Sequence, residues 1–266
     1  MTIAFYLPGG VPVYTFSLLL GLGATLGLIW VVWRAPEKQA LRYLDAGLLA
    51  LLGGLLGGRA GFVAATWNYY QHHAVEIFAL HRGGYSWAGA LAGGLLALAL
   101  VAVLKHISLG LLSDAMLPLL ATLTVASWLG CWLGGCAYGP KTDHWFRFPV
   151  MNEWGQTANR VPTQLLGAVL TLVLFWCLDW IRTILIARGR PAPPGVFALL
   201  GLLLLSLEML ALSYLRVDFS LMWNGLRLEA WAALGFAVLA ALLLIISLLL
   251  FRIQRKTVER RINPKG

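Results

Sequence analysis

The sequence carries few charged residues for its length. Only 12% of its 266 residues are Asp, Glu, Lys or Arg, 60% are hydrophobic, and the mean hydropathy is +0.79. Soluble globular domains contain about 25% charged residues, so this composition excludes that class. Lipid is therefore the expected solvent for most of the chain, and the expected fold class is an all-α integral membrane protein.

Cysteine is also scarce, with residues only at Cys131, Cys136 and Cys177. All three lie in apolar surroundings, and three are too few for the disulfide framework of a secreted domain. Cys131 and Cys136 are five residues apart, which places them about 140° apart on a regular helix. A disulfide or a metal pair would require the glycine-rich segment around them to unwind, so we expect both to pack as small apolar side chains.

The sequence does not indicate a nucleic acid, a metal or another cofactor as a partner. Its net charge of +9 comes from Lys and Arg in loops and in the tail after Phe251, a distribution that signals membrane topology. His72, His73 and His81 share one loop, where interfacial or solvated histidines are commoner than a metal site.

Seven apolar runs are long enough to cross a bilayer core of roughly 30 Å. They cover Val11–Trp33, Tyr43–Thr66, Tyr85–Leu104, Leu109–Tyr138, Pro162–Ile184, Gly195–Leu215 and Leu228–Phe251. The fourth run contains Pro118 and ends among several glycines, which favours a kink or an unwound segment. We predict one transmembrane domain over residues 1–266, with a basic tail at 252–266.

The distribution of Lys and Arg predicts the orientation. If the N-terminus lies outside, thirteen of the twenty basic residues fall in inside loops and the C-terminal tail, and seven fall outside. The positive-inside rule favours this arrangement, with a cytoplasmic C-terminus. The two longest outside loops, residues 67–84 and 139–161, are then the segments expected to add polar groups to a site.

Ionisable residues inside transmembrane segments are costly, so each is a candidate for function. Arg59, near the outer end of the second run, either clamps a phosphate or pairs structurally with a carboxylate or with backbone carbonyls. Asp114 and Asp179 lie toward inner helix ends, where water or a basic neighbour is the simpler explanation. Glu208, in the middle of the sixth run, requires a partner or a proton.

Several motifs, in order along the chain, resemble those of the prolipoprotein diacylglyceryl transferase family. Gly57-Gly58-Arg59-Ala60-Gly61-Phe62 is similar to its GGRLGY segment, and Gly83-Gly84-Tyr85-Ser86-Trp87 to its GGMSF segment. The stretch from Gly130 to Gly139 is similar to the GRxGNFxNxExxG signature, and Pro162-Thr163-Gln164-Leu165 to the PxQLYE segment.

The resemblance implies a bacterial inner-membrane enzyme with seven transmembrane helices and the N-terminus outside. In the implied reaction, a lipobox cysteine of a preprolipoprotein attacks phosphatidylglycerol, which leaves a diacylglyceryl thioether and glycerol phosphate. Such a reaction needs a base for the thiol proton, a cation for the phosphate and a groove for two acyl chains.

The chain departs from the family at several polar positions. The family histidine corresponds to Ala88, and the signature arginine to Trp128. The signature asparagine and glutamate correspond to Cys131 and Cys136, and the glutamate of the PxQLYE segment to Gly167. The first-helix tyrosine falls near Phe16, and the arginine and glutamate of the sixth helix fall at Met209 and Ser213 or, with a shifted register, at Glu208.

Two functions are therefore weighed. In the first, the chain is a divergent transferase that binds phosphatidylglycerol or another phospholipid, and its replacement base is Glu208 or a thiolate at Cys131. The residues expected to bind lipid or phosphate are Arg59, Arg82, Ser86, Gly139, Arg160, Gln164 and Arg216. In the second, the groove persists without chemistry, and the chain binds a phospholipid or a lipoprotein as a scaffold. Convergence of Arg59, Arg82 and Arg160 on one cavity with a carboxylate or imidazole would favour the enzyme.

Overall fold

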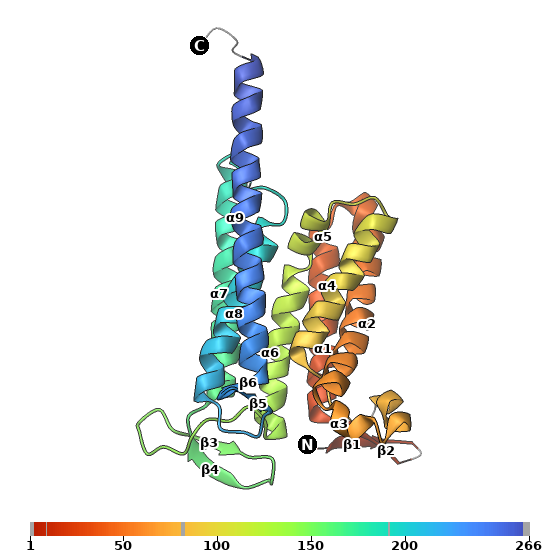
Figure 1. Ribbon diagram of the computed structural model, residues 1–266, viewed down its shortest axis with the longest axis vertical. Coiled ribbons are helices and arrows are strands. Elements are labelled where there is room, and N and C mark those ends of the chain that lie inside the picture. The colour runs from red at the N-terminus through yellow and green to blue at the C-terminus, as the bar shows by residue number, and fades with distance from the viewer. Residues whose placement is uncertain (1–2, 9, 81–82, 191, 263–266) are drawn as a thin grey trace.

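The computed structural model describes residues 3–8, 10–80, 83–190 and 192–262. Within that part, seven helices are long and apolar enough to cross a membrane, which confirms the number of spans. They are α1 (Thr15–Arg34), α2 (Ala40–Ala65), α4 (Trp87–Leu104), α6 (Leu117–Gly134), α7 (Thr163–Ala187), α8 (Val196–Leu215) and α9 (Leu228–Ile262). In Figure 1, α6 lies between a group formed by α1, α2 and α4 and a group formed by α7, α8 and α9.

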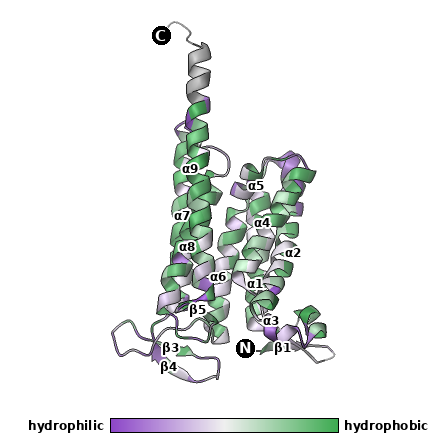
Figure 2. Ribbon diagram, in the orientation of Figure 1, coloured by the Kyte–Doolittle hydropathy of each residue, from purple (hydrophilic) through white to green (hydrophobic). Residues whose placement is uncertain are grey.

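The outer faces of these helices are apolar. Leu26 and Ile29 on α1 and Ile245 on α9 are each more than half exposed, and similar side chains recur along the other spans. Figure 2 shows hydrophobic residues along the lengths of the helices and hydrophilic ones toward their ends. Such surfaces would be unstable in water, so they fit burial in lipid, and the chain is a multi-pass membrane protein.

The fourth apolar run is interrupted twice, as its proline and glycines predict. A short helix α5 (Leu109–Ala115) stops before Met116, and Pro118 then occupies the first turn of α6, where its missing N–H costs no hydrogen bond. The helix ends at Gly134, because Gly135 adopts a left-handed backbone conformation with φ of 73°. Residues up to Tyr138, which were predicted to be helical, instead form a loop.

Three β-hairpins lie at one end of the bundle, which we call the hairpin end (Figure 1). They pair β1 (Ile3–Leu7) with β2 (Val11–Tyr14), β3 (Phe148–Met151) with β4 (Thr157–Arg160), and β5 (Met222–Trp223) with β6 (Leu226–Arg227). The short helices α3 (Trp67–Tyr70) and η2 (Ala74–Phe78) lie at the same end. The prediction that a helix begins at Val11 was wrong, since Val11–Tyr14 pairs with the first strand.

The opposite end holds the 3₁₀ helix η1 (Glu37–Gln39), α5 and the C-terminal part of α9, which projects beyond the other helices in Figure 1. Here the Asp114 carboxylate accepts hydrogen bonds from the backbone N–H groups of Gly195 and Ala198 at 2.8 and 2.7 Å and so caps α8. Asp179 forms an ion pair with Arg34. Asp179 therefore has the basic neighbour that the simpler explanation predicted, whereas the Asp114 carboxylate is held by backbone N–H groups instead.

Glycines allow α2 and α4 to pack backbone against backbone. Gly53, Gly57 and Gly61 on α2 face Gly89 and Gly93 on α4, and a Cβ atom added at Gly57 would lie 2.5 Å from the Gly89 carbonyl oxygen. In lipid, apolar burial does not drive helices together, so close packing of small residues becomes the main attraction. This contact holds α2, the helix that carries Arg59, against α4.

We predict that Gly57→Ala destabilises the protein, because the new methyl group forces two backbones apart. The expected loss in the free energy of unfolding is about 1–3 kcal/mol, measured by thermal unfolding in detergent micelles. Gly21→Ala on α1 is the matched control, since a Cβ atom there has open space around it. Equal stability of both variants would contradict this packing.

The structure places the basic inside loops and the outside loops at opposite ends of the bundle, but which end faces the cytoplasm remains a prediction. We expect alkaline phosphatase inserted after Lys141, at the hairpin end, to be active, because this enzyme folds only outside the cytoplasm. The same enzyme fused after Gly266 should be inactive. The reverse pattern would contradict the orientation derived from the positive-inside rule.

Candidate functional site

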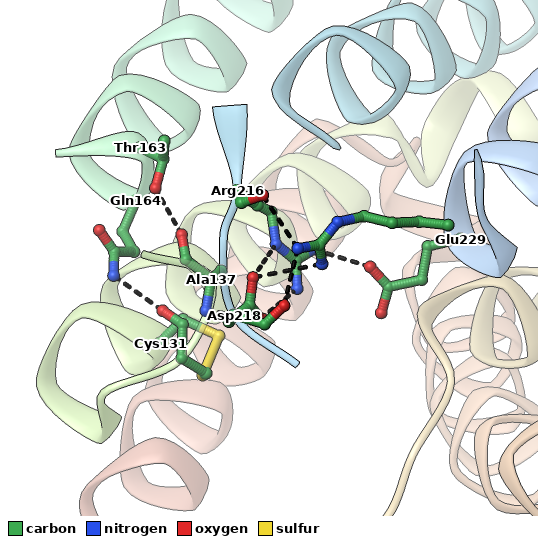
Figure 3. The surroundings of a disulfide bond; sticks show 9 residues. Cys131, Ala137, Thr163, Gln164, Arg216, Asp218 and Glu229 are labelled. Carbon is green, nitrogen blue, oxygen red and sulfur yellow. Dashed lines mark hydrogen bonds and ion pairs between the residues drawn. A yellow bond between two sulfur atoms is a disulfide. The ribbon is translucent and has the colours of Figure 1, made fainter. Parts of the chain in front are cut away.

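The loop that follows α6, residues 136–139, is a meeting point for three helices at the hairpin end. Its first residue is joined to α6 by a disulfide between Cys131 and Cys136, whose Cα atoms are 4.6 Å apart. This pairing is possible because the helix ends between the two cysteines, so the separation expected on a regular helix does not apply. Figure 3 shows the disulfide beside the side chains that bind the loop.

The disulfide corrects two expectations about these cysteines. They were expected to pack as separate apolar side chains, but they are covalently linked. Cys131 was also a candidate for the catalytic base, yet a half-cystine has no thiol to deprotonate. Where the resemblance places a family asparagine and glutamate, this chain thus has one covalent bond.

Side chains from other elements hold the backbone of the 136–139 loop. The Gln164 amide donates to the Cys136 carbonyl at 2.7 Å, and the Thr163 hydroxyl donates to the Ala137 carbonyl. The Ala137 N–H donates to the Asp218 carboxylate at 3.2 Å (Figure 3). Because Gln164 and Thr163 begin α7, while Asp218 follows α8, these contacts fix both helices relative to α6.

Arg160, at the end of β4, contacts the last two residues of this loop. Its guanidinium lies 4.5 Å from the centre of the Tyr138 ring, and Nη1 donates to the Gly139 carbonyl at 3.3 Å. Arg160 is buried, and its Nε has no hydrogen-bond partner among the described residues. Burial, together with the Glu153 carboxylate, raises the pKa of Tyr138 to about 12, so its hydroxyl stays neutral at physiological pH.

Arg216 is fully engaged in a charge cluster next to the loop. It pairs with Asp218 at 2.7 Å and with Glu229 at 2.8 Å, while Arg227 approaches Asp218 at 3.3 Å. The cluster contains two cations and two carboxylates, so it offers little net charge to a phosphate. The two arginines instead fix the position of the Asp218 carboxylate, which accepts a hydrogen bond from the Ala137 N–H (Figure 3).

Deeper in the bundle, the position of the family arginine is occupied by a packed tryptophan. A Cβ atom at Gly167 would lie 2.5 Å from Cδ2 of Trp128, so the indole ring rests directly on the backbone of α7. Trp128 packs with Ala137, Ala168 and Leu212 in an apolar cluster. The substitutions at the family arginine and glutamate positions therefore compensate each other in volume.

Beside this ring lies the buried carboxylate of Glu208. The Thr171 hydroxyl donates to its Oε1 at 2.8 Å. The indole N–H of Trp128 lies next to the same carboxylate. The geometry between them is not that of a hydrogen bond, and neither Trp128 Nε1 nor Glu208 Oε2 has another partner among the described residues. Glu208 thus has one of the partners that a buried carboxylate requires, and one oxygen remains unpaired.

Arg59 belongs to a different part of the molecule. Its Nε donates to the Ile77 carbonyl at 2.9 Å, Nη1 to those of Gly83 and Gly84 at 2.6 and 3.2 Å, and Nη2 to that of Glu76 at 2.5 Å. The guanidinium also lies 5.3 Å from the centre of the Tyr70 ring. This geometry is the structural alternative considered for Arg59, in which it fixes the loop between α2 and α4.

The remaining expected site residues fall on both sides of the bundle. Ser86 caps α4 by accepting from the Gly89 N–H at 3.3 Å, and its own N–H donates to the Gly58 carbonyl at 2.9 Å. Arg82 lies outside the described residues. Gly139 belongs to the 136–139 loop, Arg160 and Gln164 donate to its carbonyls, and Arg216 pairs with the Asp218 that binds it. Arg59 and Ser86 hydrogen-bond elsewhere, at the contact of α2 with α4. The described residues therefore do not show Arg59 and Arg160 converging on one cavity.

Several important residues were not among the expected ones. Thr171, Asp218 and the pairing of Trp128 with Gly167 are visible only in three dimensions. One signal was present in the sequence, because a large residue replaces the family arginine where a glycine replaces the family glutamate. Such opposite changes in volume are typical of two positions in contact.

The fold and this site define a multi-pass α-helical membrane protein with a set of buried polar side chains, Arg160, Gln164, Trp128 and Glu208, that extends from the hairpin end between α6, α7 and α8. We call this set the polar wall. The family model described as prolipoprotein diacylglyceryl transferase matches residues 2–246, so the chain belongs to that family. A phosphatidylglycerol–prolipoprotein diacylglyceryl transferase of Bacillus cytotoxicus is 26% identical over 94% of this chain and 90% of its own length. Proteins of the same name from Thermosynechococcus vestitus, 26% identical over 86% of this chain and 88% of theirs, and Nitrosospira multiformis, 32% identical over 69% and 64%, are also similar.

We predict that removing the disulfide by Cys131→Ser with Cys136→Ser lowers the free energy of unfolding by about 2 kcal/mol, the chain-entropy value for so short a loop. Thermal unfolding in detergent would measure the loss. Cys177→Ser, which removes the free cysteine on α7, is the control. In the untreated protein, a maleimide reagent should label one cysteine after denaturation, and three after reduction. Three labelled cysteines without reduction would contradict the disulfide.

Proposed function

We propose that this protein is a diacylglyceryl transferase of the bacterial cytoplasmic membrane, acting on phosphatidylglycerol and on the lipobox cysteine of a preprolipoprotein. The observation that carries this proposal is family membership over nearly the whole chain, with curated relatives that carry the name of this activity. A buried polar wall on α6, α7 and α8, at the family's signature positions, supports a retained site. The proposed active face is the hairpin end.

The proposed reaction forms one bond and breaks one. The lipobox sulfur bonds to the glycerol carbon of the diacylglyceryl group, and the bond from that carbon to the phosphate oxygen breaks. The thiol proton passes to a base, and the electron pair of the broken bond leaves with glycerol phosphate. The protein must therefore supply a proton acceptor and positive charge near the phosphate.

Arg160 is the proposed cation. It is buried, it lies at the hairpin end above α7, and its Nε is unpartnered among the described residues. A phosphate oxygen is a natural acceptor for this group, because hydrogen bonds to an ionised partner are stronger than neutral ones. Arg59 is instead assigned a structural part, since its nitrogens already bind four carbonyl oxygens.

Glu208 is the proposed proton acceptor. Its Oε1 is fixed by Thr171, which leaves Oε2 for a proton. The chain lacks the family histidine, which corresponds to Ala88 in the first turn of α4. Among the described parts of α6, α7 and α8, Glu208 is the one carboxylate that is buried.

Two observations favour a second function, the binding of phospholipid or lipoprotein without turnover. Trp128 fills the place of the family arginine and packs in an apolar cluster, and a disulfide replaces two further polar residues of the signature. In this alternative the protein keeps the lipid-binding scaffold and presents a bound lipid or lipoprotein to another protein.

We predict that purified protein, incubated with phosphatidylglycerol and a lipobox peptide, adds a diacylglyceryl group to the peptide, as measured by mass spectrometry. Arg160→Gln should slow this transfer by about 100-fold or more, because it removes charge beside the developing phosphate. Arg160→Lys should retain more activity than Arg160→Gln. Arg147→Gln, on an exposed arginine of the same end, is the matched control and should be unaffected.

Two results would separate the alternatives. Absence of any mass gain, with phosphatidylglycerol still bound to the folded protein, would contradict transfer and favour binding alone. Equal activity in the wild type and Arg160→Gln would leave transfer standing and contradict the assignment of the cation.

A further inference from the structure

Two residues in the turn that follows α6 have a left-handed backbone conformation. They are Gly135, with φ of 73°, and Ala137, with φ of 54°. Glycine adopts this conformation without strain, but in alanine the Cβ atom lies too close to the following carbonyl oxygen. A residue keeps a strained backbone only where the surrounding structure determines it, and such residues gather at active sites and switch regions. Ala137 is therefore the strained point of the 136–139 loop.

Constraints on both sides hold Ala137 in this conformation. Its N–H donates to the Asp218 carboxylate at 3.2 Å, and its carbonyl accepts from the Thr163 hydroxyl. The residue is 2% exposed and packs in the apolar cluster with Trp128. On its N-terminal side, the disulfide ties Cys136 to the last turn of α6. The disulfide is the covalent member of this set, so breaking it removes the firmest constraint on the loop.

The disulfide can be reached from the hairpin end. Cys131 and Cys136 are both partly exposed, and the loop continues into the exposed residues Pro140 and Lys141. Accessible or strained disulfides are the labile and regulatory ones, whereas structural disulfides resist reduction by glutathione. Because Ala137 can relax only after the disulfide is broken, its backbone strain shifts the equilibrium toward the two thiols.

We infer that the Cys131–Cys136 disulfide is a reversible redox site that exchanges with thiols and controls the conformation of the 136–139 loop. In the oxidised form, the carbonyls of Cys136 and Ala137 accept from Gln164 and Thr163. In the reduced form, Ala137 leaves the left-handed conformation and both carbonyls turn away. Gln164, a member of the polar wall, then loses the contact that positions it. The effect on activity rests on the proposed function, because it is a regulation of the same site.

The exchange conserves atoms and electrons. A thiolate of the reductant attacks one sulfur of the disulfide, a mixed disulfide forms, and the other cysteine leaves as a thiolate that takes up a proton. A second thiol of the reductant then attacks the mixed disulfide, so the reductant leaves as its own disulfide and both cysteines are thiols. Two electrons pass from the reductant to the cysteine pair, and a disulfide oxidant reverses the reaction.

The test equilibrates the full-length protein in micelles with mixtures of reduced and oxidised glutathione. Maleimide labelling after denaturation counts the free cysteines, which are one in the oxidised protein and three in the reduced protein. We expect reduction of the folded protein in glutathione mixtures that leave structural disulfides intact. Hydrogen exchange of residues 135–139, measured by mass spectrometry, should be several-fold faster in the reduced form, and transfer to the lipobox peptide several-fold slower.

Ala137→Gly is the diagnostic variant, because glycine carries no strain at this φ. The variant should shift the equilibrium constant with glutathione roughly tenfold toward the disulfide, the order expected for one left-handed alanine. Its loop should also exchange more slowly than the wild-type loop after reduction, since the hydrogen bonds then hold an unstrained backbone. Ala168→Gly is the matched control, because it removes a methyl group from the same apolar cluster within a regular helix. It should respond to reduction as the wild type does.

Two results from the wild type would overturn the inference, whether or not a variant folds. Resistance of the folded protein to glutathione would make the disulfide a structural link only, and unchanged hydrogen exchange after reduction would show that the loop does not depend on it. Equal transfer by the oxidised and reduced forms would reject the regulation while the proposed function stands. A loop that responds to reduction in a protein without transfer in either form would retain the redox site and reject the proposed function.

Discussion

The indole ring of Trp128 packs directly against the backbone of Gly167, and this contact determines what the polar interior of the protein can contain. Any side chain at position 167 would collide with the ring, and a smaller residue at 128 would leave a cavity between α6 and α7. Because the ring fills the place that the resemblance assigns to a family arginine, positive charge is absent from that depth of the described wall. The indole N–H remains as a donor beside Glu208, and the buried arginine of this region is Arg160, at the hairpin end.

The disulfide between Cys131 and Cys136 positions the residues at the hairpin end of the wall. It ties the end of α6 to the 136–139 loop, and the loop in turn binds Gln164, Thr163 and Asp218. A covalent bond thus replaces the hydrogen bonds that an asparagine and a glutamate could make at these positions. Disulfides persist in oxidising compartments, which agrees with an external hairpin end, the orientation that the basic residues predict.

The sequence was sufficient to predict the seven spans, because about 20 consecutive apolar residues can be stable only within lipid or a protein core. It also predicted the break in the fourth span, where Pro118 cannot serve as an interior helix residue. The hairpins were missed, since strands of two to five residues carry little pattern, and Val11–Tyr14 continues the apolar run of α1. The disulfide could not be predicted, because Cys131 and Cys136 can pair only if α6 ends between them, and the sequence does not locate a helix end to within one turn. The two possible roles of Arg59 could be separated only by locating the carbonyl oxygens of Glu76, Ile77, Gly83 and Gly84.

The central claim is that a wall rebuilt around Trp128 and Glu208 still supports the reaction of the family. The most direct measurement is expression of this chain in bacteria depleted of their own diacylglyceryl transferase, followed by mass analysis of a reporter lipoprotein. The account predicts a diacylglyceryl group on the reporter cysteine and restored growth, both lost with Glu208→Gln. An unmodified reporter, in cells where the protein is folded in the membrane, would contradict the account and assign the protein to lipid binding alone.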